Sequence, residues 1–357
     1  MTLKVRENVS LAELTTLKIG GAARFFVSAL NEGEVADALK FAEQNDLQVF
    51  ILGGGSNVLI ADEGFNGLVL QIALKGISTV RGNDETVFVT ARAGEDWDEF
   101  CAFCVEKNIA GVECLSGIPG FVGGTPVQNV GAYGQEVAET IASVRAFDRK
   151  TKEILELTGA DCGFAYRTSI FNTAAKNRFI VLAVTFALQQ GGTPKIIYRD
   201  LREFFDGKKP TLRETRAAVL KIRRAKSMVI DENDPNSKSA GSFFKNPIVD
   251  LEKFAEIEAR ARTLGVIGAD EEVPKFAAGE NSLKIPAAWL IERSGFEKGF
   301  RCGRVGLSTN HTLAIVNFEN AAARDVLNLK NLIQLKVKEK FGIELKPEPI
   351  FVGFKES

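Results

Sequence analysis

Residues 116–134 read SGIPGFVGGTPVQNVGAYG and include six glycines but no charged side chain. A surface loop of this length is normally polar. The run therefore predicts backbone that wraps around a large planar ligand and directs its N–H groups at a pyrophosphate. Gln128 and Asn129 are suited to hydrogen-bond the polar edge of a ring. A tight buried crossover of the chain is the alternative interpretation.

A second glycine-rich segment, LGGGSN at residues 52–57, directly follows an apolar run at residues 47–52 that is typical of a buried strand. Three consecutive glycines let the backbone approach a ligand closely, and their N–H groups can form an anion-binding nest. The segment does not match G-x-G-x-x-G, and no helix pattern follows at once, which disfavours a Rossmann dinucleotide site. By itself, such a turn is equally consistent with a purely structural role.

Length and composition indicate a globular chain with more than one core. The sequence has 357 residues, 45% of them hydrophobic and 25% charged, and domains of roughly 100–200 residues predict two or three of them. No stretch approaches the ~20 apolar residues that span a bilayer. The first residues, MTLKVRENVSL, lack the apolar segment of a secretory signal, so we expect a cytoplasmic protein without a membrane partner. The net charge of −1 supplies no basic field for nucleic acid.

The five cysteines predict neither a disulfide framework nor a metal site. Their number is odd, and the chain is long. Cys101 and Cys104 recur with Trp97 and Phe100 at helical spacing, which predicts packing on an apolar helix face. A zinc site is disfavoured because His311 is the only histidine and there is no second pair of cysteines.

Apolar periodicity predicts an α+β fold with many irregular loops. In the first part of the chain it indicates a helix at residues 34–45 and strands at 47–52, 68–71, 87–91, 144–148 and 180–188. From about Thr211 a second region follows, with helices at 212–225, 287–294 and 321–341, a polar loop at 231–239, and strands at 313–317 and 349–353. Gly342 is typical of a left-handed cap that ends the longest helix.

Six motifs, in order along the chain, resemble one enzyme family. They are TTLKIGGAARFF, LGGGSN, IPGFVGGTPVQNVGAYG, YRTSIF, GSFFKNP and KPEPIFVG. Together they extend from about residue 14 to 354 and are similar to the UDP-N-acetylenolpyruvoylglucosamine reductase (UDP-N-acetylmuramate dehydrogenase) family. The resemblance implies an FAD-binding fold of the vanillyl-alcohol oxidase-like type with a separate C-terminal α/β substrate domain. The implied ranges are an FAD-binding region at 1–210, with subdomains at about 1–75 and 76–210, a substrate-binding domain at 211–345, and a C-terminal strand at 346–357 that returns to the active site.

The resemblance also implies a reaction and its catalytic residues. NADPH reduces FAD, which passes a hydride to C3 of an enolpyruvyl group on a UDP-sugar while C2 gains a proton, in the synthesis of a peptidoglycan precursor. Ser242 matches the family's proton donor, and Arg167 and Glu348 match the residues that stabilise the enol intermediate. A guanidinium supplies a permanent charge and a planar fork that suits a carboxylate. Glu348 is expected to be protonated, or paired with Arg167, because a second anion would repel the enolate.

Contacts to cofactor and substrate follow from the same match. FAD is expected to contact both glycine-rich segments, at Gly53, Gly54, Gly55, Ser56, Asn57, Pro119, Gly120, Gly123, Gly124, Gln128, Asn129, Gly131, Ala132 and Tyr133. The UDP-sugar is expected to contact Tyr198, Lys226, Lys245, Asn246 and His311. The segment around Tyr198 implies the longer of the family's two subtypes. Ile350 departs from the pattern, since relatives often have Arg or Lys there. No obligatory protein partner is implied.

Two alternatives belong to other classes of protein. The first is a flavin oxidase or dehydrogenase of the same FAD fold that acts on an alcohol or a sugar. Many such enzymes attach FAD through a histidine, but none precedes His311, so FAD is expected to be non-covalent. Cys114 is the remaining candidate for a tether. The second alternative is a nucleotide-binding module without activity, and the presence of Ser242, Arg167 and Glu348 at their motif positions argues against it.

Overall fold

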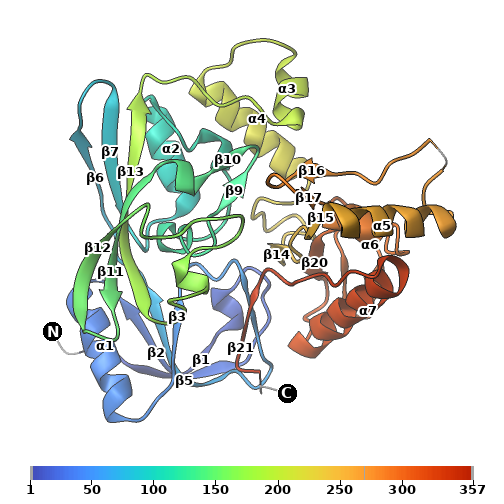
Figure 1. Cartoon of the computed structure of the whole chain (residues 1–357). Helices are drawn as coiled ribbons and strands as arrows, with labels where there is room; N and C mark the ends of the chain where they lie inside the picture. Colours follow the sequence, from blue (N-terminus) through green and yellow to red (C-terminus); the bar gives the residue numbers. More distant parts are fainter. Residues whose placement is uncertain (1–2, 269, 355–357) are drawn as a thin grey trace. The chain divides into compact units, whose positions relative to one another are not determined.

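Two units make up the part of the chain that the computed structural model describes, residues 3–268 and 270–354 (Figure 1). The first unit comprises the chain up to Val9, Ala22–Gly55 and Phe65–Ile230, and the second comprises Ser10–Gly21, Ser56–Gly64 and the chain from Asp231 onward. The helix expected to open the substrate-binding domain thus lies in the first unit, and two short segments from early in the chain lie in the second. The expected assignment of domains to cofactor and substrate stays a prediction.

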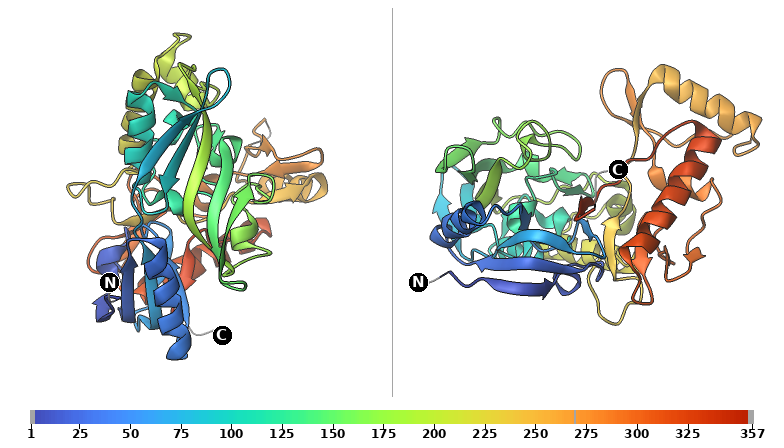
Figure 2. Two further views of the ribbon diagram at one scale, coloured as in Figure 1. Left: turned by 90° about the vertical axis from the view of Figure 1, so that its left-hand side faces the viewer. Right: turned by 90° about the horizontal axis from the view of Figure 1, so that it is seen from below.

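A small sheet with parallel neighbours opens the first unit. Its order is β1-β2-β5-β3, with bounds β1 Arg6–Ser10, β2 Ala22–Ala29, β5 Phe65–Ile72 and β3 Val49–Leu52. Both β2 and β3 run parallel to β5. Parallel strands need a crossover connection, and helix α1, Glu32–Gln44, supplies one between β2 and β3 while packing against β2 and β5 (Figure 2). The Asn31 side chain begins this helix by accepting a hydrogen bond from the amide of Glu34 at 2.9 Å.

A larger antiparallel sheet forms the rest of the core of the first unit. Its order is β12-β11-β13-β7-β6, with β8 paired to β13, and its bounds are β12 Glu153–Thr158, β11 Ile141–Asp148, β13 Phe179–Gln190, β7 Thr86–Arg92, β6 Ile77–Arg81 and β8 Ile109–Ala110. Helix α2, Trp97–Glu106, places Trp97 and Phe100 in ring contact with Phe186 of β13. Cys101 and Cys104 are buried on this helix, which confirms the predicted packing role.

A hairpin and two helices also belong to the first unit. A hairpin of β9, Gly131–Ala132, and β10, Gln135–Glu136, lies at the end of the long glycine-rich segment. Helices α3, Arg199–Phe205, and α4, Leu212–Ala225, pack together. The bounds of α4 are those that the periodicity predicts. Thr211 and Glu214 form a capping box at its start, in which each side chain bonds the other residue's amide.

Within its described residues, the second unit combines three small sheets with three α-helices. The sheet β14-β20-β19-β18 has bounds Ser239–Ser242, Ala314–Asn317, Val305–Leu307 and Arg301–Cys302; the sheet β15-β17-β16 has bounds Ile248–Asp250, Ser282–Lys284 and Phe276–Ala277; and the parallel pair β4-β21 has bounds Val58–Ile60 and Ile350–Val352. Helices α5 and α6 both pack against α7 (Figure 1), with bounds α5 Leu251–Thr263, α6 Ala287–Glu292 and α7 Ala323–Phe341.

The longest helix ends as its sequence predicts. Gly342 follows α7 with φ +66°, in the left-handed region that costs glycine little, and its amide donates to the carbonyl of Lys338 at 2.9 Å. The inward residues of α7, Val326, Leu329, Ile333 and Val337, are fully buried. None of the described helices is long and apolar enough to cross a membrane.

Candidate active site

The three glycines that follow β3 serve different purposes. A Cβ atom added to Gly54 would lie 2.7 Å from the Cα of Gly120, so only glycine permits this approach of the two glycine-rich segments. Gly55 has φ +66°. Over Gly53, by contrast, the space where a Cβ would point is open. Two glycines thus shape the turn, and the third leaves backbone accessible to a ligand.

The long glycine-rich segment shows the same division. A Cβ added to Gly123 would lie 2.6 Å from the Cβ of Ala93, whereas the space over Gly124 is open. Backbone hydrogen bonds hold the segment against residues 93–97: the amide of Gly123 donates to the carbonyl of Ala93 at 2.9 Å, and the amide of Trp97 donates to the carbonyl of Gly120 at 3.0 Å. The backbone is therefore fixed before any ligand binds, which lowers the entropic cost of binding.

The two polar residues in the middle of this segment differ in burial. The Asn129 side chain is buried and donates to Glu136 Oε2 at 2.8 Å and to the carbonyl of Ala165 at 3.1 Å, while its oxygen accepts from the amide of Ala138 at 3.1 Å. These hydrogen bonds hold the loop in shape and occupy the Asn129 side chain. If Asn129 contacts FAD as predicted, it does so through its backbone. Gln128 is only partly buried beside it.

The side chain of Arg167 contacts the backbone of the long glycine-rich segment. Its Nη2 donates to the carbonyl of Gly131 at 2.9 Å, its Nη1 donates to the carbonyl of Asn129 at 3.5 Å, and its guanidinium lies 5.5 Å from the ring centre of Tyr166. The backbone of Arg167 has φ +52°, a conformation that bulky residues rarely adopt and that is often found at functional sites. The structure thus brings this predicted catalytic cation to the predicted cofactor loop.

The next residues of YRTSIF hold the turn in place. The amides of Ala165 and Thr168 each donate to the other's carbonyl at 3.0 Å, which closes a tight turn around Arg167. The hydroxyl of Ser169 is buried and donates to the carbonyl of Val127 at 2.6 Å. This motif therefore attaches the arginine to the glycine-rich segment, a role that is not evident from the sequence.

A cluster of aromatic and charged side chains surrounds Lys226, at the end of α4. Lys226 Nζ pairs with Asp200 Oδ2 at 2.6 Å and lies 5.9 Å from the ring centre of Tyr133. The Tyr133 ring contacts Tyr198 edge to face, with 5.5 Å between centres. Tyr133, predicted to bind cofactor, thus lies with Tyr198 and Lys226, which are predicted to bind substrate. Burial raises the pKa of Tyr133 despite the nearby cations.

Arg223 also belongs to this cluster, and its burial was not predicted from the sequence. Its side chain is 6% exposed, its Nη2 donates to the carbonyl of Met228 at 2.6 Å, and among the described residues none accepts a hydrogen bond from its Nε. Burial lowers the pKa of Arg223. The available signal is spacing: Thr215, Val219 and Arg223 recur every four residues, on the buried face of α4.

In the second unit, Ser242 ends β14, next to β20. Its Oγ lies 3.3 Å from His311 Nε2, which places His311 at the predicted proton donor. The following residue, Phe243, donates its amide to the carbonyl of Leu313 at 2.7 Å and accepts from the amide of Glu348 at 2.9 Å. The predicted serine and glutamate therefore occupy neighbouring backbone segments of one unit.

The C-terminal segment reaches this position through long-range pairing. The amide of Lys245 donates to the carbonyl of Lys346 at 3.0 Å, and the amide of Ile350 donates to the carbonyl of Asn57 at 3.0 Å. Strand β21 then continues parallel to β4, which follows the LGGGSN turn. Asn246 Oδ1 accepts from the amide of Ala287 at 2.8 Å and so satisfies the start of α6. The predicted substrate contact of Asn246 is left to its NH2 group.

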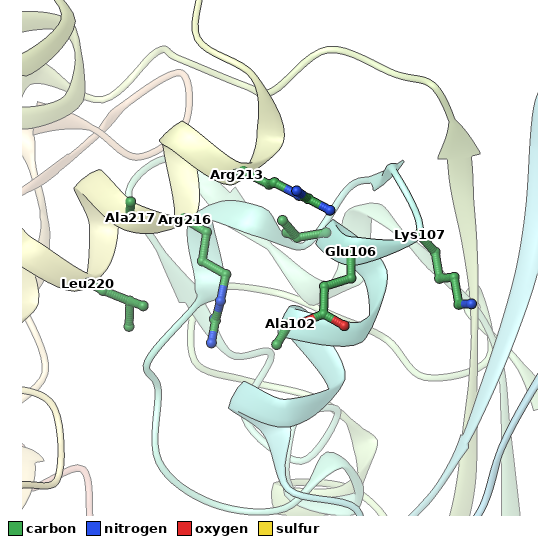
Figure 3. Close-up of a pocket in the computed structure, with 8 residues that line it drawn as sticks. Ala102, Glu106, Lys107, Arg213, Arg216, Ala217 and Leu220 are labelled. Atoms are coloured by element: carbon green, nitrogen blue, oxygen red, sulfur yellow. The ribbon is translucent and has the colours of Figure 1, made fainter.

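A groove of about 650 Å³ lies elsewhere on the first unit, between α2 and α4 (Figure 3). It is lined by Ala102, Val105, Glu106, Lys107, Arg213, Arg216, Ala217 and Leu220. Arg216 pairs there with Asp98, at 2.9 Å for Nη2 and Oδ2. None of the lining residues belongs to the predicted site, and the ion pair joins the two helices.

Comparison with known proteins agrees with these features. The family model of UDP-N-acetylenolpyruvoylglucosamine reductase, C-terminal domain, matches residues 234–352, and that of an FAD binding domain matches residues 23–158. UDP-N-acetylenolpyruvoylglucosamine reductase of Thermobifida fusca is 42% identical over 357 residues, 99% of each chain. Its namesake in Saccharopolyspora erythraea is 43% identical over 96% of this chain and 94% of its own. The crystal structure of the Thermus caldophilus reductase covers 98% of this chain and 100% of its own, with a TM-score of 0.66 and 25% identity.

Fold, glycine-rich segments and family models together define an FAD-dependent oxidoreductase. More specifically, the chain belongs to the UDP-N-acetylenolpyruvoylglucosamine reductase family. The family, the fold class and the FAD-binding domain inferred from the motifs are thereby confirmed, and the flavin oxidase alternative is not supported. The open space over Gly53 and Gly124 fits a cofactor that approaches bare backbone.

We expect FAD to be bound without a covalent link. Cys114, the remaining candidate for a tether, is fully buried, its Sγ donates to the carbonyl of Lys195 at 3.4 Å, and burial raises the pKa of its thiol, which suppresses the reactive thiolate. Acid precipitation of the purified protein should release all of the yellow colour into the supernatant. Colour that stays with the pellet would contradict the expectation, and mass spectrometry of the pellet would locate the link.

Proposed function

We propose that Ser242, Arg167 and Glu348 carry out the reduction of UDP-N-acetylglucosamine enolpyruvate to UDP-N-acetylmuramate, a step in peptidoglycan precursor synthesis. The observation that carries this proposal is the arrangement around Ser242, whose hydroxyl is 3.3 Å from His311 Nε2 and whose neighbour Phe243 is bonded to the backbone of Glu348. The reaction consumes the UDP-sugar, NADPH and one proton and calls for no protein partner, and we place it in the cytoplasm.

Arg167 is proposed to stabilise the charge that develops on the substrate. FAD, when bound, supplies the hydride that it has received from NADPH. Addition of a hydride to C3 leaves negative charge on C2 and on its carboxylate, and a fixed cation stabilises that charge best when it needs no reorganisation. The guanidinium of Arg167 is held by the carbonyls of Gly131 and Asn129, so its fork is oriented before the substrate arrives.

Ser242 is proposed to donate the proton to C2. A hydroxyl is a weak acid, but it is small and neutral, and the developing carbanion is a strong base. His311 lies within hydrogen-bond reach of the hydroxyl and can hold it in one orientation. Glu348 acts as a hydrogen-bond donor or acid, because an ionised carboxylate beside the enolate would be repelled.

The substrate's diphosphate and sugar are proposed to bind to Tyr198, Lys226, Lys245, Asn246 and His311. Lys226 and Tyr198 belong to the cluster around Tyr133 in the first unit. A partly buried ammonium next to aromatic rings suits a diphosphate, which gains from a cation with few water molecules around it. Retention of Tyr198 supports the longer subtype.

Steady-state kinetics test this function. NADPH and the enolpyruvyl sugar must each place a carbon within roughly 3–3.5 Å of the same flavin atom, so two bulky nucleotides cannot bind productively together. We expect double-reciprocal plots at several low, fixed sugar concentrations to be parallel, with inhibition at high sugar concentrations as the sugar binds oxidised enzyme. Conversion should yield UDP-N-acetylmuramate, identified by its mass.

Two outcomes would count against the proposal. Lines that meet at one point would show that both nucleotides bind at once. NADPH and the sugar would then not share a single pocket at the flavin, as the proposal requires. An enzyme that is reduced by NADPH but leaves the enolpyruvyl sugar unchanged would show that the substrate is another compound.

A further inference from the structure

The ammonium of Lys226 already has an anionic partner within the first unit. Its Nζ lies 2.6 Å from Asp200 Oδ2, and the two side chains are 39% and 31% exposed. Burial alone would lower the pKa of Lys226, but the hydrogen bond to Asp200 and the nearby Tyr133 outweigh it, so the pKa is raised. The cation is thus partly desolvated, fully charged and paired.

This pair conflicts with a ligand that carries negative charge. A diphosphate bound to Lys226 would place its oxygens beside the Asp200 carboxylate, where like charges repel more strongly than in bulk water. An ammonium offers three N–H donors but balances only one charge. Carboxylate and diphosphate therefore compete for the same cation, and the ion pair must loosen when the diphosphate binds.

The position of Asp200 allows such an exchange. It lies in the first turn of α3, two residues after Tyr198. The helix is anchored independently, because Leu201 is fully buried in a cluster with Ala218 and Val219 of α4. The helix therefore keeps its place when the ion pair opens, and the carboxylate can turn toward solvent.

We propose that Asp200 is a displaceable counter-ion of Lys226 that weakens, and so sets, the affinity of the site for a nucleoside diphosphate. In the ligand-free protein Asp200 balances the charge of Lys226, and the diphosphate takes its place. This inference rests on the proposed function, which assigns the diphosphate to Lys226. Asp200 would thus lower the affinity for the diphosphate, whereas Lys226 raises it.

Asp200→Asn is the test, since the amide keeps the shape of the side chain and loses its charge. We expect calorimetric titration of UDP into the FAD-loaded enzyme to show binding that is tighter by about two- to fivefold, the range of a half-exposed ion pair that no longer has to be broken. The gain should shrink as salt is added, because salt screens both charges. Glu203→Gln is the matched control: Glu203 is on the same helix but pairs with Arg199 at 2.7 Å, so its loss should change UDP affinity much less.

Other outcomes distinguish the counter-ion role of Asp200 from the proposed binding of the diphosphate at Lys226. UDP binding by Asp200→Asn that is equal to or weaker than that of the unchanged enzyme would overturn the counter-ion role and indicate that Asp200 positions α3. In Lys226→Met, UDP binding should fall, and adding Asp200→Asn to that variant should restore little of it. If Lys226→Met binds UDP as tightly as the unchanged enzyme, the diphosphate does not bind at Lys226, and the proposed function is wrong at this residue as well.

Discussion

Replacing Ser242 by alanine is expected to slow the oxidation of reduced enzyme by the enolpyruvyl sugar by about 10²–10⁴-fold, the usual contribution of a general acid, while NADPH still reduces the flavin at nearly the normal rate. The two half-reactions separate because only the second needs a proton at C2. Stopped-flow absorbance of the flavin, recorded anaerobically for each half-reaction, measures both rates.

Two further variants show whether the effect is chemical. Ser242→Cys should recover part of the rate, because a thiol also donates a proton. Ser239→Ala removes a hydroxyl from the same strand, one that accepts from the amide of Gly241 at 3.3 Å and has no proposed catalytic role, so both half-reactions should stay near normal. Equal slowing of both half-reactions in Ser242→Ala would mean that this serine is structural.

Arg167→Lys is expected to lose nearly as much activity as Arg167→Ala, about 10²–10³-fold, the cost of removing a preorganised charged donor. Lysine keeps the charge but not the fork by which Arg167 contacts two backbone carbonyls. Backbone strain cannot explain a difference between arginine and lysine, since φ +52° disfavours both side chains equally. The measurement is kcat/KM for the enolpyruvyl sugar, with single-turnover flavin oxidation as a second readout.

Arg178→Lys provides the matched control for Arg167. Arg178 belongs to the same unit and makes a two-pronged ion pair with Asp148, at 2.7 Å for Nη2 and Oδ2, but no reaction step is assigned to it. Its replacement should leave kcat/KM almost unchanged. Near-normal turnover of Arg167→Lys would show that positive charge alone suffices at that position.

Elements with a clear local pattern could be predicted well. The structure confirms α4 at the predicted bounds and a strand at β3, which begins two residues later than expected and is only partly buried before Leu52. Helix α5 was missed although Phe254, Ile257 and Ala261 are buried at helical spacing. Strand β2 was missed because its residues were considered only as part of a motif.

The site could be predicted only where a motif marked it. Arg167, Ser242 and the glycine-rich segments stand in recognisable surroundings, and the structure shows that Gly54 and Gly123 are required by close contacts with Gly120 and Ala93. Asp200 was missed because a single charged residue on a helix is usually solvated. Asp200 matters through its ion pair with Lys226, which lies 26 positions further along the chain, at the end of another helix.

The sequence by itself determined the family, the cofactor class and the helices and strands whose apolar residues recur with a fixed period, because these depend on neighbours within a few residues. Only the tertiary structure decided which segments belong together. Strand β21 pairs with β4 from the opposite end of the chain, and residues 10–21 and 56–64 join the second unit. Such pairing depends on backbone hydrogen bonds, which every residue except proline can make in the same way. The local sequence of a strand therefore does not indicate which other strand it pairs with.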